Sequence, residues 1–527
     1  MVTKRLDREP KELKYMSKRF LMGIDIGTSG CKITVFNFKG NVISTYLGEY
    51  ETHYPGTGCV EHDPDDWWQA VCKGVKYFKN EQSINPKEIA AIGVDGLSWA
   101  GLPVDEEGNP LRNVMIWLDR RAEKQAQWMK EEIGEDKLIQ LNGNPVDPAY
   151  ITPKMLWIKE NEPDIYNKTH KFLQSNGFIV YKLTGEFSQD YSQGYGFHFF
   201  DMNSGAYDKK IASQLGLSLD KVAPIYNCHQ VVGEVTKTAA RETGLVSGIP
   251  VVAGGLDAAC CTLGAGVIKP GQTQEQGGQA GGMSIQVDSP KFHPKLIFGY
   301  HVIPDQWLLQ GGTTGGGGTL RWFEQQLGAH EDKIADKRDI SSYQVMDEEA
   351  AEINPGSDGL IFLPYMAGER SPIWNSKARG VWFGLSYDKT RAHLIRSMME
   401  GVGFSLLHNL KTAAEVGAQV TELNSVGGAA NSKLWTQMKA DITGNKFNVP
   451  YSDHATTLGG AILAGVGAGI YQDFEEAVER TIKVQRTHEP DMKKHETYQR
   501  YYDLYLELYE QLEESYETLY ELANEQY

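Results

Sequence analysis

Residues 21–32 read Leu-Met-Gly-Ile-Asp-Ile-Gly-Thr-Ser-Gly-Cys-Lys, an apolar stretch that carries one acid and ends in a turn of small and hydroxyl residues. The run Ile33-Thr34-Val35-Phe36 follows, so the pattern predicts two strands joined by a tight hairpin. Glycine lets backbone N–H groups approach an anion closely, and Asp25 beside such a turn suggests a magnesium-bound phosphate. A plain glycine hairpin with a buried acid explains these residues equally well. The P-loop pattern, Gly-x-x-x-x-Gly-Lys-Ser/Thr opening a helix, does not occur.

Length and composition predict a globular protein of several domains. The chain has 527 residues, of which 41% are hydrophobic and 23% charged, values typical of soluble proteins. Its formal net charge of −17 argues against nucleic acid or an anionic membrane as the main partner, because both attract clustered Lys and Arg. The chain contains no run of 18 apolar residues, so the sequence does not predict a membrane span.

The cysteines and the N-terminal segment bear on the compartment. The six cysteines show no Cys-x-x-Cys spacing, so we expect buried thiols in a reducing cytoplasm. Residues 1–19 are basic and polar without an apolar core, so they predict a disordered extension rather than a secretory signal.

Strand-like and helical segments alternate along both halves of the chain, which predicts the α/β class. A small-residue turn at Gly278 follows the turn at Gly27 by about 250 residues, which suggests two related α/β halves. A Tyr stripe in the last segment is typical of a docking helix face. The pattern predicts strands over 89–94 and 248–254, and helices over 64–80, 120–132, 206–222, 258–266, 390–410, 458–470 and from about 496.

Two segments could carry chemistry on an alcohol. Phosphoryl transfer requires a base, donors for the phosphates and polar groups for the acceptor. Asp257 follows Gly254-Gly255-Leu256 at a predicted strand end, where it suits a base, although it also suits a helix N-cap. The segment 117–121, Trp-Leu-Asp-Arg-Arg, combines a ring, an acid and two guanidinium groups as sugar sites do, and a helix start with surface salt bridges is the competing interpretation.

Three further motifs stand out along the chain, and they are Gly380–Leu385 with His393–Glu400, Lys154–Asn161 and Gly427–Trp435. In that order they are similar to the C-terminal signature, the N-terminal signature and the adenosine-binding turn of the FGGY carbohydrate kinase family, and within that family the chain resembles the xylulokinase-like pentulose kinases. The resemblance spans about residues 20–515.

The resemblance implies an α/β fold of two RNase H-like, actin-like ATPase domains with the active site in the cleft between them. Residues 20–265 would form an N-terminal domain that binds sugar and carries the first phosphate hairpin. Residues 266–527 would form a C-terminal nucleotide-binding domain that ends in an amphipathic helix.

The resemblance also implies roles for single residues. Asp257 matches the catalytic base and Asp25 the metal-side acid. Gln279 stands where the family usually carries a hydroxyl in its second phosphate clamp, so its amide or the backbone would make that contact. The implied nucleotide and phosphate residues are Asp25, Gly27, Thr28, Ser29, Lys32, Gly278, Gln279, Gly281, Gly317, Gly428 and Ser432, and the expected acceptor residues are Ser98, Trp99, Asp119 and Arg121.

The sequence therefore predicts an ATP- and Mg²⁺-dependent kinase in the cytoplasm that phosphorylates a ketose, most simply a ketopentose such as xylulose. Kinases for ribulose, a hexulose, a sugar acid or a polyol are nearby alternatives, because Ser98 and Trp99 stand where xylulokinases carry Met and His. An actin-like or chaperone-like ATPase and a non-catalytic sugar sensor are alternatives of other classes. The expected partner is a small sugar, without nucleic acid or membrane, and a homodimer is left open.

Overall fold

The computed structural model describes residues 18–451 and 454–524, which fall into two compact units. Unit 1 contains the chain up to residue 268 and two returning segments, 299–307 and 454–482. Unit 2 contains residues 269–298, 308–453 and the chain from 483 onward. Residues 1–17 of the expected N-terminal extension lie outside the described residues, and Arg19 already pairs its backbone N–H with the Glu88 carbonyl at 2.8 Å.

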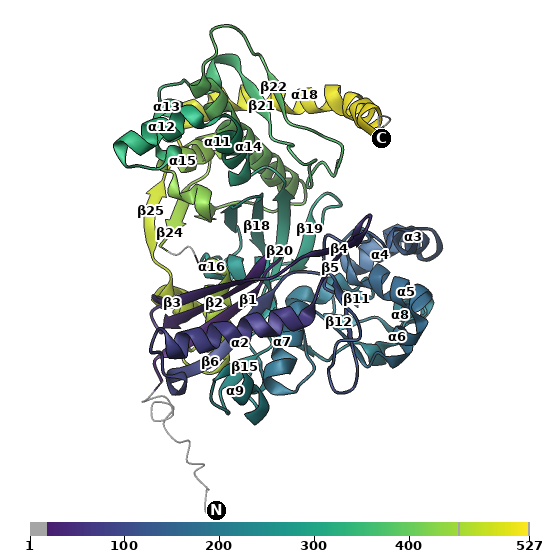
Figure 1. Cartoon of the computed structure of the whole chain (residues 1–527). Coiled ribbons are helices and arrows are strands. Elements are labelled where there is room, and N and C mark those ends of the chain that lie inside the picture. The colour runs from purple at the N-terminus through teal and green to yellow at the C-terminus, as the bar shows by residue number, and fades with distance from the viewer. Residues whose placement is uncertain (1–17, 452–453, 525–527) are drawn as a thin grey trace, which may run out of the picture. The chain divides into compact units, whose positions relative to one another are not determined.

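Unit 1 is built on a sheet whose strands lie in the order β14-β15-β6-β1-β2-β3, with the short β16 beside β6 (Figure 1). β1 and β2 form the predicted antiparallel hairpin, and β1 is parallel to β6. The strands are β1 (Phe20–Ile26), β2 (Gly30–Asn37), β3 (Val42–Glu49), β6 (Ile89–Gly96), β14 (Val231–Glu234), β15 (Pro250–Val252) and β16 (Gly255–Leu256).

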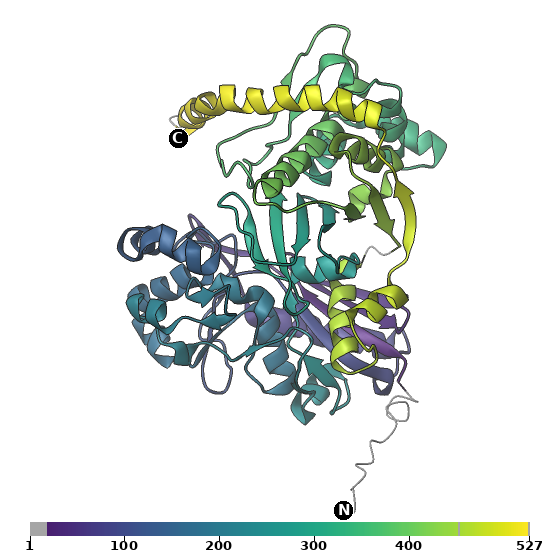
Figure 2. The ribbon, with the colours of Figure 1, turned by 180° about the vertical axis from the view of Figure 1, so that it is seen from behind.

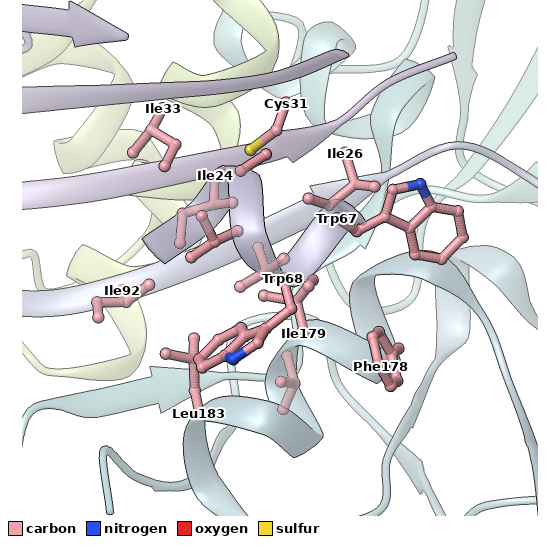
Figure 3. Close-up of a cluster of buried hydrophobic side chains, with 14 of the residues drawn as sticks. Ile24, Ile26, Cys31, Ile33, Trp67, Trp68, Ile92, Phe178, Ile179 and Leu183 are labelled. Atoms are coloured by element: carbon pink, nitrogen blue, oxygen red, sulfur yellow. The ribbon is translucent and has the colours of Figure 1, made fainter. Parts of the chain in front are cut away.

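One face of this sheet packs on the main hydrophobic core. Side chains alternate along a strand, so every second residue of β1 and β2 faces helices α2 (Pro64–Asn80) and α7 (Ser175–Thr184). Figure 3 shows this cluster, which includes Ile24, Ile26, Cys31, Ile33, Trp67, Trp68, Ile92, Phe178, Ile179 and Leu183. The alternation leaves Asp25 on the opposite face of β1.

The opposite face of the sheet is covered by α16 (Ala455–Gly467), seen with yellow-green ribbon against the purple strands in Figure 2. Glycines permit the close approach of this helix. A Cβ at Gly23 would lie 1.9 Å from the Thr457 carbonyl oxygen, and one at Gly93 would lie 1.9 Å from the Gly460 carbonyl oxygen. Helix α16 therefore closes directly over β1 and β6, next to their acidic residues.

The helices of unit 1 largely follow their local signals. Helix α2 has the predicted bounds, because Asp63 caps its N-terminus and Pro64 occupies its first turn. The predicted helix over 206–222 is wrong, since Asp208 caps a short helix that ends before Gly216, which has φ +66°. Other elements here are α3 (Glu123–Trp128), a π-helical turn (Met129–Gly134), α4 (Glu135–Asn142), α5 (Ile151–Asn161), α6 (Pro163–Lys168), β12 (Ala206–Tyr207), α8 (Lys209–Gln214), α9 (Lys237–Thr243), α10 (Asp257–Gly264) and α17 (Phe474–Thr481).

Unit 2 repeats the strand order of unit 1. Its sheet runs β19-β20-β18-β17-β23-β24-β25, and β17 pairs antiparallel with β18 and parallel with β23, as β1 does with β2 and β6. The strands are β17 (Gln272–Gly277), β18 (Gly281–Val287), β19 (Ile297–Tyr300), β20 (Trp307–Thr313), β23 (Glu422–Val426), β24 (Phe447–Pro450) and β25 (Val484–His488). The common topology supports two related α/β halves.

Helices cover the sheet of unit 2, and the last of them docks through tyrosines. The C-terminal helix α18 (Met492–Asn524), yellow in Figure 2, buries Tyr498, Tyr502 and Tyr505 against α14 (Arg391–Glu415) and its neighbours. The predicted docking function of the Tyr stripe is confirmed. The remaining long helices are α11 (Gly317–Leu327), α12 (Ala329–Arg338), α13 (Ser342–Ala351) and α15 (Lys433–Thr443). Within the described residues, no helix combines the length and apolar character needed to cross a bilayer.

Candidate active site

The hairpin between β1 and β2 ends in a tip formed by Gly27, Thr28 and Ser29. The Gly27 N–H donates to the Gly30 carbonyl at 3.1 Å, and the Tyr50 hydroxyl donates to the Gly27 carbonyl at 2.5 Å. Thr28 is half-buried and Ser29 is exposed. These contacts fix the backbone of the tip and leave its hydroxyl groups near solvent, a geometry suited to an anion.

Three carboxylic acids gather near the ends of neighbouring strands in unit 1. Asp25 on β1 stands opposite Asp95 on β6, and Asp95 stands opposite Gly255, which precedes Asp257 by two residues. Burial raises the pKa of Asp25 to about 6. Burial and the charges of Asp25 and Asp257 raise the pKa of Asp95 well above its usual range. Its surroundings therefore favour the neutral form of Asp95 more than that of an exposed aspartic acid.

Asp95 is the residue that sequence reasoning missed. It is fully buried, and its Oδ2 atom lies close to α16, where a Cβ at Gly460 would approach it to 2.9 Å. The strand end Val94-Asp95-Gly96 is similar to Ile24-Asp25-Ile26-Gly27, since each has an acid at the end of an apolar strand, one residue before a glycine in the first and two residues before it in the second. That similarity was the available signal.

Asp257 begins helix α10 at the end of β16. Its Oδ1 accepts the Ala258 N–H at 2.6 Å, so it stabilises the helix start while its second oxygen stays available. Burial and the charge of Asp25 raise the pKa of Asp257 to about 7. A carboxyl group with this pKa, partly exposed at a strand end, can take up and release a proton near neutral pH.

The backbone that leads into Asp257 requires a glycine at position 254. Gly254 has φ +75°, and a Cβ there would lie 1.7 Å from the Val94 carbonyl oxygen. Only glycine fits this position, both because the conformation is left-handed and because the β6 backbone is in contact.

The predicted acceptor residues Ser98 and Trp99 lie in the turn that follows β6. Trp99 adopts φ +58°, which is unusual for a residue with a side chain, and its ring stacks on Tyr150 with centroids 4.1 Å apart. The Trp99 N–H donates to Gln174 Oε1 at 3.2 Å. The stack and the backbone contact hold the indole in a defined place, next to Tyr195 at 6.0 Å between ring centroids.

The other two predicted acceptor residues, Asp119 and Arg121, bind each other. Arg121 Nη2 lies 2.7 Å from Asp119 Oδ2 and 2.7 Å from Glu61 Oε1. Asp119 also accepts the Val60 N–H at 2.6 Å and is fully buried. The Arg121 guanidinium lies over the Trp157 ring at 5.2 Å. In this structure the pair therefore holds the segment after Ile116 in place.

Unit 2 contains a pocket of about 750 Å³ whose walls come from four segments. Helix α11 begins at Gly317 in its lining, and a helix N-terminus attracts phosphate. Five of the predicted nucleotide residues line this pocket, namely Gly278, Gln279, Gly317, Gly428 and Ser432. Gly281 instead lines a separate small cavity, together with Glu275 and Lys439.

Gln279 packs across the start of α11. Its carbonyl accepts the Gly318 N–H at 3.0 Å, and a Cβ at Gly318 would come within 2.3 Å of the Gln279 side-chain nitrogen. The amide therefore lies at the helix N-terminus, where it can donate to an anion in place of a hydroxyl.

Asp347 on α13 is a pocket residue that no local pattern in the sequence indicated. It lines the pocket and accepts a hydrogen bond from the Ser432 hydroxyl at 2.9 Å. Ser432 in turn caps α15 by accepting the Trp435 N–H at 2.9 Å. Burial raises the pKa of Asp347 from its usual value. These contacts join α13 and α15 at one wall of the pocket.

Asp25 is the residue that fits a metal ion. Its Oδ1 atom is buried without a hydrogen-bond partner, and a carboxylate oxygen in that state suits a divalent cation. Among the described residues, no group of three or more His, Cys, Asp and Glu side chains has the geometry of a protein-only metal site. A single carboxylate fits Mg²⁺, which usually keeps waters and takes further oxygens from phosphates.

Two family models together cover most of the chain. Residues 20–264 match the N-terminal domain of the FGGY family of carbohydrate kinases, and residues 288–468 match its C-terminal domain.

Individual relatives and solved structures agree with these matches. Xylulose kinase of Staphylococcus epidermidis is 31% identical over 92% of this chain and 96% of its own length. Gluconokinase of Bacillus licheniformis is 30% identical over 86% of this chain and 89% of its own length. The crystal structure of xylulose kinase from Rhodospirillum rubrum superposes with a TM-score of 0.86 at 26% identity, over 95% of this chain and all of that one.

Proposed function

The chain belongs to the FGGY family of carbohydrate kinases and is an ATP-dependent sugar kinase, and from this premise we propose that it phosphorylates a ketopentose such as xylulose. The observation that carries the proposal is Asp257, a partly exposed acid with a pKa of about 7 at the end of a strand, beside Asp25 and Asp95. A hydroxyl group needs such a base to become a nucleophile.

Asp257 acts as the general base in this proposal. In its ionised form it accepts the proton of the acceptor hydroxyl while that oxygen attacks the terminal phosphorus of ATP. Its Oδ1 remains bonded to the Ala258 N–H, so the proton goes to Oδ2. The fixed orientation supplies positioning, which is the main means of catalysis in phosphoryl transfer.

The hairpin tip and unit 2 hold the nucleotide. In unit 1, the phosphate oxygens of ATP are bound by Gly27, Thr28, Ser29 and Lys32. The unit 2 pocket binds the nucleoside, with Gly278 and Gln279 on the phosphate side, Gly317 at the start of α11, and Gly428 and Ser432 on the adenosine side. Gly281, which lines a separate small cavity, is also proposed to lie on the phosphate side. Asp25 would hold Mg²⁺, which neutralises phosphate charge when bound.

The division of labour between the two parts of the chain is also proposed. Residues 20–265 would bind the sugar and carry the first phosphate hairpin, and residues 266–527 would bind the nucleotide. We further propose that the kinase works in the cytoplasm, where its six free cysteines stay reduced, and that a homodimer is the assembly to test by light scattering.

Neutral ketoses are favoured over sugar acids, because the cationic side chains of the acceptor-side segments are already engaged by groups of the protein. Arg121 is engaged with Asp119 and Glu61, and the buried ammonium of Lys154 donates to two backbone carbonyls. A sugar acid would require a cation for its carboxylate, and a neutral ketose requires none. The Trp99 ring supplies an apolar wall, as C–H faces of sugars prefer.

The test is ADP release in the presence of Mg²⁺ against a panel of ketopentoses, ketohexoses, sugar acids and polyols. We expect the highest kcat/KM with a ketopentose. A preference for gluconate would refute the proposed ketopentose acceptor, but the assignment as a carbohydrate kinase would still hold. ATP turnover that no sugar stimulates would support an ATPase that acts on another partner, and sugar binding without turnover would support a sensor.

A further inference from the structure

Trp117 connects the acceptor-side segment of unit 1 to the phosphate hairpin through one hydrogen bond. Its indole N–H donates to the Thr28 hydroxyl, with 3.0 Å between nitrogen and oxygen, across 89 positions of sequence. The Trp117 side chain is half-buried and packs against the core cluster that also contains β1 and β2. The contact is therefore part of the packed structure of unit 1.

The chemistry of the two groups fixes the direction of this hydrogen bond. An indole N–H can only donate, whereas a hydroxyl has one proton and two lone pairs. The Thr28 oxygen accepts from Trp117, so its own proton points elsewhere. No acceptor for this proton is found among residues 18–451 and 454–524, and Thr28 is partly exposed. The hydroxyl is thus left as a donor at the hairpin tip.

A buried lysine holds the backbone beside Trp117. Lys154 on α5 is fully buried, and its ammonium donates to the carbonyls of Ile116 and Trp99, both at 2.8 Å. The Ile116 carbonyl also accepts the Asp119 N–H at 3.0 Å. Displacing a buried ammonium from its acceptors is costly, so the backbone that carries the indole is held firmly.

We propose that Trp117 is a positioning residue that keeps the Thr28 hydroxyl oriented as a hydrogen-bond donor to a phosphate oxygen of ATP. The proposal rests on the proposed function, in which the hairpin tip binds phosphate. A donor that is oriented before the anion arrives stabilises developing charge without reorganisation. A threonine hydroxyl without Trp117 would rotate and could present either a lone pair or its proton.

The test is a double-mutant cycle on the two side chains. Trp117→Phe keeps a ring and removes the N–H, Thr28→Val keeps the shape and removes the hydroxyl, and Thr28→Ser keeps the hydroxyl. We expect Trp117→Phe to lower kcat about two- to tenfold, as for one neutral hydrogen bond, with the acceptor KM unchanged within about twofold. Thr28→Ser should recover most of the kcat that Thr28→Val loses, because it keeps the hydroxyl. In the Thr28→Val background, Trp117→Phe should cause no further loss.

A matched control comes from another tryptophan of unit 1. Trp68 lies on α2, and its indole N–H donates to Glu242 Oε2 at 2.7 Å rather than to a residue of the hairpin tip. Trp68→Phe removes a hydrogen bond of the same donor, and we expect kcat and both KM values to stay unchanged. An equal fold-loss from Trp117→Phe in the wild-type and Thr28→Val backgrounds, or no loss in either, would overturn the proposal.

The same double-mutant cycle can be measured without turnover by calorimetric titration with ATP, and with adenosine as a ligand that lacks phosphate. We expect Trp117→Phe and Thr28→Val to weaken ATP binding and to leave adenosine binding unchanged. Equal weakening of both ligands would overturn the role of Trp117. A wild-type chain that binds ATP but phosphorylates no sugar would refute the proposed function alone, because the binding cycle would still report on Trp117 and Thr28.

Discussion

Replacing Asp257 by Asn tests the chemistry of the proposed base most directly. Asn has nearly the same shape, and its side-chain oxygen can still accept the Ala258 N–H that Asp257 Oδ1 accepts at 2.6 Å. The start of α10 should therefore survive. The change removes the ability to take up a proton, and it removes one of three acids that lie close together.

The expected loss follows from the function of a general base. Such groups contribute about 10²–10⁴-fold to the rate, which corresponds to about 3–5.5 kcal/mol of transition-state stabilisation. We expect kcat to fall within this range, while the KM for ATP stays within about threefold, because Asp257 is not among the residues that line the nucleoside pocket.

The pH profile sharpens the test. Burial and the charge of Asp25 raise the pKa of Asp257 to about 7, and only the ionised form can act as a base. The active fraction is then about one tenth at pH 6, about one half at pH 7 and about nine tenths at pH 8. Activity should rise with pH through this window in the wild type. The residual activity of Asp257→Asn should lack that rise. Any pH dependence that remains in this variant comes from other groups, such as the phosphates of ATP, and serves as the baseline.

Stability should move in the opposite direction with pH. The pKa of Asp257 is raised on folding, so the folded state binds more protons than the unfolded state between the unfolded pKa and about 7. The wild type should lose stability as pH rises through that window. Asp257→Asn should lose less, because it cannot ionise, and thermal unfolding at pH 5 and pH 8 measures the difference.

The assay is coupled ADP release with the best ketose of the panel, at five pH values. Asp105→Asn is a matched control, since that acid lies in a surface turn of the same unit and its pKa is lowered by hydrogen bonds from Asn109 and its neighbours. It should change neither kcat nor the profile. Near-normal turnover of Asp257→Asn, or an unchanged pH rise, would refute the assignment of the base.

Three further outcomes follow from the structure. Arg121→Leu leaves the buried Asp119 without its cation, whereas Glu61 keeps its ion pair with Arg112. Breaking the Asp119 pair should cost about 3–5 kcal/mol in urea unfolding, and a loss below about 1 kcal/mol would contradict the interpretation of Asp119 and Arg121 as a structural pair. Ser432→Ala removes the cap of α15 and the bond to Asp347, so it should cost about 1 kcal/mol of stability and raise the KM for ATP severalfold, whereas an unchanged KM would exclude this wall from nucleotide binding. Removing Mg²⁺ with EDTA should abolish turnover and leave the circular dichroism spectrum unchanged, and activity that persists would remove the metal from the mechanism.

Local signals in the sequence predicted several elements well. The bounds of α2 follow from Asp63 and Pro64, whose capping and ring geometry act within one turn of the helix. The hairpin of β1 and β2 follows from alternating apolar residues on either side of a small-residue turn. The predicted resemblance to FGGY kinases is confirmed, because its motifs are contiguous stretches that a sequence displays directly.

Long-range contacts account for what the sequence could not predict. The helix expected over 206–222 is interrupted near Gly216, which adopts a left-handed conformation. The segment 454–482 returns to unit 1, where α16 packs on glycines of β1 and β6 that are far away in sequence. The interpretation of Asp119 and Arg121 as sugar ligands competes with their own ion pair, and only their observed distance reveals that pair.

The sequence by itself determined the family and the α/β class, because both are carried by residues that are neighbours along the chain. It also singled out Asp25 and Asp257 as candidate site acids, whose functions stay predictions. Only the tertiary structure placed Asp95 beside Asp25, since parallel pairing of β1 with β6 joins residues that no local pattern connects. It also decided that the Thr28 hydroxyl accepts from Trp117. The hairpin that opens the chain was recognisable from its residues, and the direction in which its hydroxyl donates depends on a ring 89 positions away.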